Sequence, residues 1–529
     1  MIRTLALSAA ALAAAVSSAA AQDSAVVRAD TVAVVVDPAD TLPVAADAPL
    51  AARRFDASPP LPEEHWAARA ALRAEMLGLA PAYFPAQRSV PRHVVAAALE
   101  EAARSAEGRP GVEALARGWW ARFVEEFPEY GAAERAGGVM LLGRSLSGGY
   151  AEARGRLSPG IGYQVDEQPP RPIADESGVA AGAMGSVALG RHATLFLEST
   201  LRDGDAGVHR WDVSAGAAGW AVSAGRQEIG YGPARGGGIV LSPQEPFTRA
   251  ELQTTHPFRL PWVLRYLGPL TVHTAVTRMD SGRHPTEPWF WSLRIAARPH
   301  PRFTIAGNRA SIFGGEGKPV TAEKLVKLAF GVIRSDFENQ VVSGDLRWRL
   351  PTEAVLPATV YLEWGADDGA GAITEIPGLT AGVLFPAVPG VPQLALGAEY
   401  ATIGEACCGH GSWYHNATFP GNWARADQPL GHPMGGEGWE AAGIAQAELL
   451  DARLRVDGRL YGRNYSDQSA AVNRRGNLYA PTRVGRSTGG TLEAAFRVIR
   501  GADLRAGYRR EEGDGWTEDG FHAELAVFF

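Results

Sequence analysis

The chain has 529 residues, of which 51 are basic and 58 are acidic, and its formal net charge is −7. Hydrophobic residues make up 46% and charged residues 21%, which excludes a chain that is disordered throughout. No basic stripe offsets the acidic balance, so we expect no nucleic-acid partner. Two cysteines are too few for a disulfide-stabilised fold, and the 62 glycines favour many turns and strands.

The N-terminus has the pattern of an export signal. A basic residue, Arg3, precedes an apolar run over residues 5–16, and the small residues 19–21 follow it. This pattern predicts a secretory signal peptide over residues 1–21, because the apolar run is shorter than the ~20 residues of a membrane-spanning helix. Residues 22–60 are rich in proline and alanine and are predicted to form a flexible tail.

Residues 61–135 have helical periodicity and predict a small helical bundle. We expect the first helix to open at Pro62, where two glutamates follow in the first turn. Ser89 is a candidate N-cap for a second helix. A third helix is predicted between Val112 and Phe127, whose apolar residues are spaced by three and four.

From about Gly138 to the C-terminus, the hydrophobic period changes to two. Leu346, Trp348 and Leu350, for example, alternate with charged residues. Such strands fit either a soluble β-sandwich or a transmembrane β-barrel with a polar lumen. The end of the chain favours the barrel, because it resembles the assembly signal of bacterial outer-membrane barrels. Its apolar face consists of Phe521, Ala523, Leu525, Val527 and the terminal Phe529.

Counting back from the C-terminus gives about 18 antiparallel strands within residues 136–529. The expected strands lie near 138–150, 179–190, 193–201, 208–217, 219–229, 253–264, 270–279, 289–298, 302–313, 342–350, 357–366, 379–385, 393–404, 439–449, 452–464, 490–499, 502–510 and 519–529. An even count places both ends of the barrel in the periplasm, with every long loop on the outer side. The predicted fold is therefore an all-β transmembrane barrel with an N-terminal α-helical bundle on the periplasmic side. Because a barrel of this size has a wide lumen, we expect the bundle to plug it.

No hydrolase signature stands out, and neither a His-Glu-x-x-His motif nor a P-loop is present. Cys407 and Cys408 are adjacent in an outer loop, where a direct bridge would be strained. A strained vicinal disulfide, a metal site with His410 and His415, and a neutral loop without function are the three interpretations of this pair. We expect no cofactor.

Three segments in order resemble the Wzi-type capsule-assembly family. They are Gly225-Arg226-Gln227 with Gly230-Tyr231-Gly232-Pro233 and Leu241-Ser242-Pro243; Gly307-Asn308-Arg309-Ala310 with Phe313-Gly314-Gly315-Glu316-Gly317; and Trp413-Tyr414-His415-Asn416 with Gly421 and Leu430-Gly431-His432-Pro433. With the N-terminal helices, the resemblance covers residues 61–529. It departs from the family at Tyr231, where a tryptophan is commoner, and in the tail before residue 61.

The resemblance implies an outer-membrane barrel of eighteen strands with a periplasmic helical bundle. It also implies a non-enzymatic, lectin-like role: the protein would bind capsular or exopolysaccharide and anchor it at the cell surface. Its partners would be this polysaccharide, outer-membrane lipid and, through Phe529, the barrel-assembly machinery. We expect a monomer.

The sequence offers two groups of polysaccharide-binding candidates. Aromatic rings cover the apolar faces of sugars, while amides and guanidinium groups bind hydroxyls and carboxylates. The first group lies in the 405–438 loop: Trp413, Tyr414, His415, Asn416, Trp423 and Arg425. The second group consists of arginines expected to point into the lumen: Arg309, Arg347, Arg453 and Arg455. In the alternative interpretation, the loop packs on itself and the arginines pair with lumen carboxylates such as Asp345, Glu363, Glu399 and Asp457.

Two other functions remain open from the sequence. The barrel could be a diffusion or substrate-specific porin, which a large steady single-channel current would support. It could also be a barrel hydrolase of lipid or glycan, which product release abolished by one serine or histidine substitution would support.

Overall fold

A computed structural model gives the fold of the chain. It describes residues 55–109, 111–131, 138–154, 177–202, 205–243, 246–279, 284–329, 337–367, 378–404, 413–414, 416, 418–419, 423–425, 428–450, 452–465 and 485–529. The predicted signal peptide and most of the predicted tail lie outside these residues. So do Cys407, Cys408, His410 and His415, with the alternatives raised for them.

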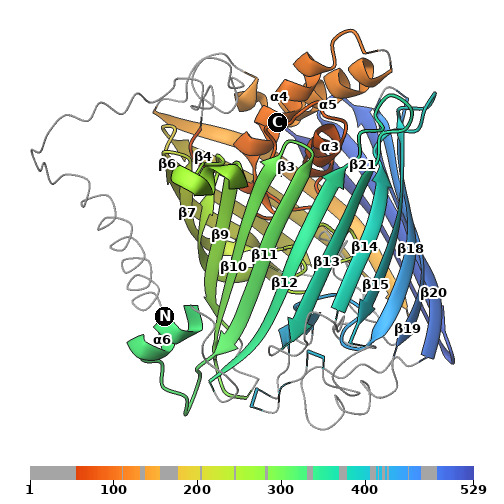
Figure 1. Ribbon diagram of the computed structural model, residues 1–529. Helices are drawn as coiled ribbons and strands as arrows, with labels where there is room; N and C mark the ends of the chain where they lie inside the picture. Colours follow the sequence, from red (N-terminus) through yellow and green to blue (C-terminus); the bar gives the residue numbers. More distant parts are fainter. Residues whose placement is uncertain are drawn as a thin grey trace, which may run out of the picture. The chain divides into compact units, whose positions relative to one another are not determined.

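Eighteen of the described strands form one closed antiparallel barrel (Figure 1). They are β3 (Val139–Arg154), β4 (Ser177–Leu189), β5 (Ala193–Arg202), β6 (Asp205–Ala217), β7 (Trp220–Gln227), β8 (Phe247–Thr254), β9 (Leu270–Arg278), β10 (Trp289–His300), β11 (Phe303–Phe313), β12 (Glu338–Arg349), β13 (Thr359–Asp367), β14 (Gly378–Phe385), β15 (Leu394–Ile403), β18 (Gly438–Leu449), β19 (Leu454–Tyr465), β20 (Gly485–Ile499), β21 (Ala502–Gly513) and β22 (Trp516–Phe528). The predicted fold and strand count are confirmed.

One predicted strand is misplaced. The sequence predicted a strand over 253–264, but β8 ends at Thr254, and the 3-10 helix η4 (Trp262–Leu267) lies farther along. Pro257 and Pro261 explain the difference, because proline cannot donate to a strand ladder. The connection over 255–269 is therefore long, although it lies on the same side as the short turns. This contradicts the expectation that every long loop lies on the other side.

The two faces of the wall differ as the period of two requires. On β21 and β22, Leu504 pairs with Leu525, and these side chains point away from the lumen with 45% and 47% of their area exposed. The next pair, Asp503 with Ala526, is buried on the lumen side. The barrel thus presents an apolar outer surface and a polar interior.

The barrel closes between its first and last strands. β22 pairs with β3 over Phe528↔Ser145 to Asp519↔Arg154. The backbone N–H of Phe529 donates to the Arg144 carbonyl at 3.0 Å, and the Arg144 guanidinium lies 5.3 Å from the Phe529 ring centroid. The apolar C-terminal strand is therefore part of the wall to its last residue.

Three helices precede the barrel: α3 (Trp66–Met76), α4 (Arg92–Ser105) and α5 (Val112–Glu126). The predicted starts of two helices need correction. The first helix begins at Trp66 rather than Pro62, because the His65 side chain accepts from the Ala67 N–H and caps it. The second is preceded by Pro91 rather than Ser89, and its N-cap has no side-chain hydrogen bond.

These helices lie at the end of the barrel where the short turns are found, which we call the short-turn end (Figure 1). A short two-stranded sheet, β1 (Pro60–Leu61) with β2 (Val90–Pro91), ties the segment before α3 to the segment before α4. Trp119, Phe123 and Phe127 form part of an apolar core that also includes Leu142 and Ala188 of the wall. We call residues 55–131 the plug, because this core joins the helices to the barrel. No described helix has the length and apolar character that a membrane span requires.

Candidate functional site

Buried ion pairs hold the plug to the barrel wall. Arg122 of α5 donates to Asp503 of β21 at 2.6 Å, and both side chains are almost fully buried. Glu75 of α3 accepts from Arg298 at 3.2 Å and from Arg347 at 2.9 Å. Because a buried charge is costly without a partner, these pairs fix where the helices sit in the lumen.

A second segment, residues 228–243, enters the lumen between the plug and the opposite end. The Arg88 backbone N–H donates to the Gly230 carbonyl at 3.1 Å, which joins this inner segment to the plug. The backbone N–H groups of Arg235 and Gly236 each donate to the Glu399 carboxylate at 2.7 Å. Gly232 has a φ of +82°, and a Cβ there would lie 2.2 Å from Glu363 Oε2. The left-handed backbone at Gly232 favours glycine, and a larger residue would have to displace the Glu363 carboxylate.

An aromatic cluster lies toward the other end of the lumen. Trp413, Tyr414, Phe419 and Trp423 have at most 3% of their area exposed. They pack on Ile239 and its neighbours in the inner segment. We call this cluster the aromatic cap. It belongs to the end with the long connections, which we call the long-loop end.

Hydrogen bonds fix the polar atoms of the aromatic cap. The Tyr414 hydroxyl donates to the Ile239 carbonyl at 2.5 Å and accepts from the His432 N–H at 3.0 Å. The Trp423 indole N–H donates to the Val240 carbonyl at 2.9 Å. Asn416 accepts from two backbone N–H groups of its own turn at 2.9 and 3.0 Å. The polar groups of Tyr414, Asn416 and Trp423 therefore stabilise the cap itself.

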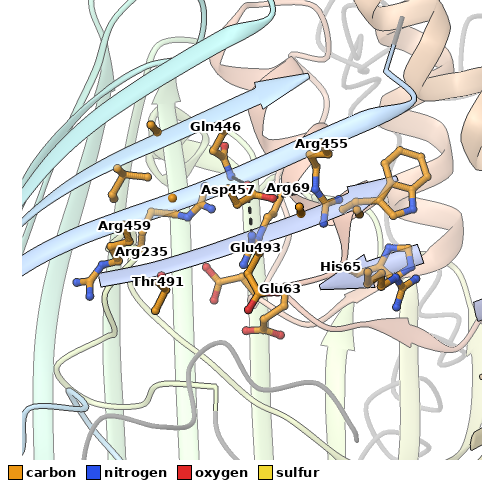
Figure 2. Close-up of a pocket in the computed structure, with 18 of the residues that line it drawn as sticks. Glu63, His65, Arg69, Arg235, Gln446, Arg455, Asp457, Arg459, Thr491 and Glu493 are labelled. Carbon is orange, nitrogen blue, oxygen red and sulfur yellow. Dashed lines mark hydrogen bonds and ion pairs between the residues drawn. The ribbon is translucent and has the colours of Figure 1, made fainter. Parts of the chain in front are cut away.

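Between the plug and the wall lies a charged cavity with about 90 Å³ of space for water-sized molecules. Figure 2 shows that plug, inner-segment and wall residues all point into it. An ion pair at 3.5 Å between Arg69 and Asp457 crosses the cavity. The labelled lining residues are Glu63, His65, Arg69, Arg235, Gln446, Arg455, Asp457, Arg459, Thr491 and Glu493.

The charges of the plug beside this cavity are fixed by their surroundings. Burial lowers the pKa of His65, so its ring is neutral and donates to Glu126 at 3.0 Å. Burial alone would raise the pKa of Glu126, but His65 and the Trp66 N–H, which donates at 2.7 Å, hold it at about 2. Burial and the nearby Glu228 carboxylate raise the pKa of Glu64 well above its usual range.

The lumen arginines pair with carboxylates, as one of the two interpretations expected. Arg455 donates to Asp457 at 2.8 Å, and Arg459 donates to Glu440 at 2.5 Å. Arg347 points inward and pairs with Glu75 of the plug. Arg347 and Arg455 therefore lie on the lumen side, where the sequence placed them, but their guanidinium groups already have protein partners.

Two predicted lumen arginines lie elsewhere. Arg453 is exposed in the turn between β18 and β19, where it donates to the Arg497 carbonyl at 3.3 Å. Arg309 pairs in register with Leu293 and so points away from the lumen, where it donates to the Leu328 carbonyl at 2.6 Å. That carbonyl belongs to α6 (Ala322–Ala329), an amphipathic helix at the long-loop end (Figure 1).

The predicted aromatic and polar loop residues are brought together, but not as an open platform. Trp413, Tyr414 and Trp423 have their rings covered by protein, so the described structure leaves no ring face for a sugar. Asn416 is also buried, whereas Arg425 is partly exposed in the short hairpin of β16 (Ala424–Arg425) and β17 (Gln428–Pro429). His415 lies outside the described residues.

A buried hydrogen-bond chain was not anticipated from the sequence. The Tyr231 hydroxyl lies 2.7 Å from His273 Nδ1, and His273 Nε2 lies 3.1 Å from Glu251. Glu251 also pairs with Arg249 at 2.8 Å, and all four side chains are closed to solvent. The only sequence signal was the Gly-Tyr-Gly-Pro segment, and it did not identify the strand residues that meet Tyr231.

Within the part of the chain that the structure describes, the geometry gives neither a metal site nor a nucleophile site. No group of three potential metal ligands occurs among the described residues. The letters Gly-x-Ser-x-Gly occur at 485–489, but they lie within β20 and not at a strand-to-helix turn. The Ser487 hydroxyl donates to Glu511 at 2.7 Å rather than to a histidine.

Comparison with known proteins gives the family. Residues 155–517 match the model of the capsule assembly protein Wzi. The solved structure of Wzi from Escherichia coli, an outer membrane protein involved in group 1 capsule assembly and a carbohydrate-binding β-barrel, aligns with a TM-score of 0.66 and 16% identity over 87% of this chain and 98% of that chain. OprD of Pseudomonas aeruginosa aligns with a TM-score of 0.46 and 11% identity over 74% of this chain and 95% of that chain. No curated protein sequence matched.

At these identities, the structural likeness establishes the fold. A closed barrel with an apolar outer face is an outer-membrane fold, because strands can cross a bilayer only when every backbone group is paired. The match to the family model covers more than half of the chain. The chain therefore belongs to the Wzi family of capsule assembly proteins.

Proposed function

We propose that this protein binds capsular or exopolysaccharide at the cell surface and anchors it there without covalent chemistry. The observation that carries the proposal is the packing inside the barrel: the plug packs on the wall at one end, and the aromatic cap packs on the inner segment toward the other. A barrel with so much chain packed inside it has little use as a wide pore, but it gives the cell a rigid outer face. The carbohydrate-binding character of the E. coli family member supports the same role.

In this proposal, the long-loop end faces the outside and the plug lies in the periplasm. That orientation follows from the general pattern of short periplasmic turns and long outer loops. The polysaccharide would contact the long-loop end, where Arg425 keeps part of its side chain exposed. Arg425 can bind hydroxyl and carboxylate groups of the glycan, while Asn416 and the cap aromatics hold the surface in shape.

The remaining candidates would act indirectly. Arg347 pairs with Glu75 of the plug, and Arg455 pairs with Asp457 of the wall. Arg309 binds a carbonyl of α6, and Arg453 binds the Arg497 carbonyl from its turn. We include His415 among the direct candidates, because it neighbours the cap in the chain. The outer-membrane lipid would contact the apolar wall, and Phe529 would be read by the barrel-assembly machinery. We propose a monomer that needs no cofactor.

A binding experiment with the host's own surface glycan tests the proposal. Purified full-length protein should capture this glycan, and cells without the protein should secrete the polymer but retain less of it. Arg425→Gln should weaken capture. Arg510→Gln is the matched control, because Arg510 is an exposed arginine that points away from the lumen near the end of β21. Unchanged glycan retention in the deletion strain would contradict the proposal.

A porin is the second candidate function. The wide barrel favours it, whereas the plug and cap oppose it. Planar-bilayer recordings separate the two, since a large steady current from the wild-type protein would indicate an open lumen and count against the anchor. A hydrolase would instead release lipid or glycan products, and this activity would be lost with a single serine or histidine substitution.

A further inference from the structure

The connection between β8 and β9 carries the most exposed apolar run among the described residues. Its 3-10 helix η4 has no buried residue. Trp262, Val263 and Tyr266 expose 88%, 73% and 70% of their area. Large apolar side chains in such a contiguous run mark a contact surface, because proteins in water rarely expose contiguous apolar patches.

This segment lies on the outside of the barrel wall. Ala297 of β10 pairs with Leu270 of β9, and both share the outer face with Ile295, which is 44% exposed. Yet Leu270 and Ala297 expose only 5% and 8%. Something outside the barrel therefore covers these two residues at the short-turn end.

Residues 255–269 lie beside these two residues. Phe258 and Leu270 exchange backbone hydrogen bonds of 3.0 and 2.7 Å, so the connection folds back along the start of β9. Gly268 approaches β10 so closely that a Cβ there would lie 2.0 Å from the Arg298 carbonyl oxygen. The exposed face of η4 thus continues the apolar outer surface of the barrel and is held to it by backbone contacts.

The composition of the segment identifies its surroundings. Residues 255–269 contain no acidic residue, and Arg259 and Arg265 are both exposed. The Arg265 guanidinium lies 5.2 Å from the Tyr266 ring centroid, beside the exposed aromatic face. Tryptophan and tyrosine concentrate at membrane interfaces, and arginine near the interface attracts the anionic phosphate of phospholipids.

We propose that η4 is an interfacial anchor. Trp262, Val263 and Tyr266 insert into the boundary between headgroups and acyl chains of the leaflet at the short-turn end, and Arg259 and Arg265 contact phospholipid phosphates. The barrel is thereby held at a fixed depth and rotation at one point of its circumference. This inference rests on the outward placement of the segment and does not depend on polysaccharide binding.

Lipid-borne fluorescence quenching tests the proposal. Full-length protein is reconstituted into vesicles of phosphatidylethanolamine and phosphatidylglycerol, with or without bromine near the carboxyl end of the acyl chains. Because the chain has 14 tryptophans, the signal of Trp262 is the difference between wild type and Trp262→Phe. We expect bromine to remove most of this difference signal.

Trp120 gives the matched control, because it is a partly exposed tryptophan on α5 of the plug, away from the outer wall. The difference signal from Trp120→Phe should not respond to brominated lipid. The double variant Arg259→Gln/Arg265→Gln should remove the dependence of Trp262 quenching on the phosphatidylglycerol content. If brominated lipid does not quench the Trp262 fluorescence, the proposal is overturned. If aqueous iodide quenches the Trp262 fluorescence instead, the surface is a docking site for a periplasmic protein.

Discussion

Replacing Arg122 by methionine should loosen the plug. Arg122 donates to Asp503 at 2.6 Å, with side-chain exposures of 6% and 1%, and its guanidinium lies 4.5 Å from the Trp66 ring centroid. Removing one partner of a buried ion pair costs about 3–5 kcal/mol. Asp503 keeps a weaker contact with Arg497 at 3.4 Å, so we expect a value near the lower limit, about 3 kcal/mol.

Hydrogen exchange of the α5 amides measures this effect, because exchange reports the free energy of local opening. A loss of about 3 kcal/mol corresponds to roughly a hundredfold loss of protection. Arg117→Met on the same helix is the matched control. Arg117 pairs with Glu113 at 2.8 Å, but its side chain is 59% exposed. Such a pair contributes about 0.3–0.5 kcal/mol, so protection should fall less than about threefold.

The reasoning requires that the two variants differ in the hydrogen-exchange protection of α5. If Arg122→Met and Arg117→Met lower protection by the same factor, the buried contact with Asp503 does not fix the plug. A double-mutant cycle with Asp503→Ala isolates the pairwise energy. Additive effects of the two substitutions would likewise refute the assignment.

Three further outcomes are expected. Gly404→Ala should displace Trp413 and lower the melting temperature of the cap, because Gly404 has a φ of +70° and a Cβ there would lie 2.2 Å from the Trp413 ring. Gly390→Ala is the control, because Gly390 has a similar φ of +78° with open space around it. An equal loss of melting temperature in both variants would show that backbone strain alone is responsible. Burial and the nearby His256 lower the pKa of His93 to about 3, so acid protonates this ring mainly in the unfolded plug. Plug stability should fall as the pH drops below about 6.5, by about 2 kcal/mol at pH 5, and His93→Gln should flatten this part of the melting profile; an unchanged profile would contradict it. Arg309→Gln removes the 2.6 Å bond to the Leu328 carbonyl and should speed amide exchange in α6, while unchanged exchange would mean that α6 is held by its apolar contacts.

The hydrophobic period of the sequence was sufficient to predict the barrel wall. Each strand shows its own alternation of apolar and polar residues, and successive barrel strands pair with each other. The number of strands, eighteen, could therefore be predicted without knowing what lies in the lumen. The strand predicted over 253–264 failed because Pro257 and Pro261 interrupt it and the segment folds back beside the start of β9. That contact depends on β9 and β10 and has no period of its own.

The candidate site was harder to predict from the sequence than the barrel wall. The outward direction of Arg309 could have been found, because Arg309 shares its parity with Phe303 and Ile305 on β11. The burial of Trp413 could not, because its neighbours come from the inner segment and from distant strands. A cluster of aromatic and polar residues looks the same in sequence whether it binds a sugar or packs against a second loop.

The pairing of β22 with β3 sets the order in which the molecule can be completed. Every other neighbouring pair joins barrel strands that follow one another in the chain, with the short β16–β17 hairpin between β15 and β18. Until the final strand is in place, β3 and β21 are both unpaired edges, and such edges recruit other chains. Nascent molecules lacking their last few residues would therefore aggregate rather than persist as smaller barrels. Since the plug directly precedes β3, it is positioned to shield one of these edges while the other is being made.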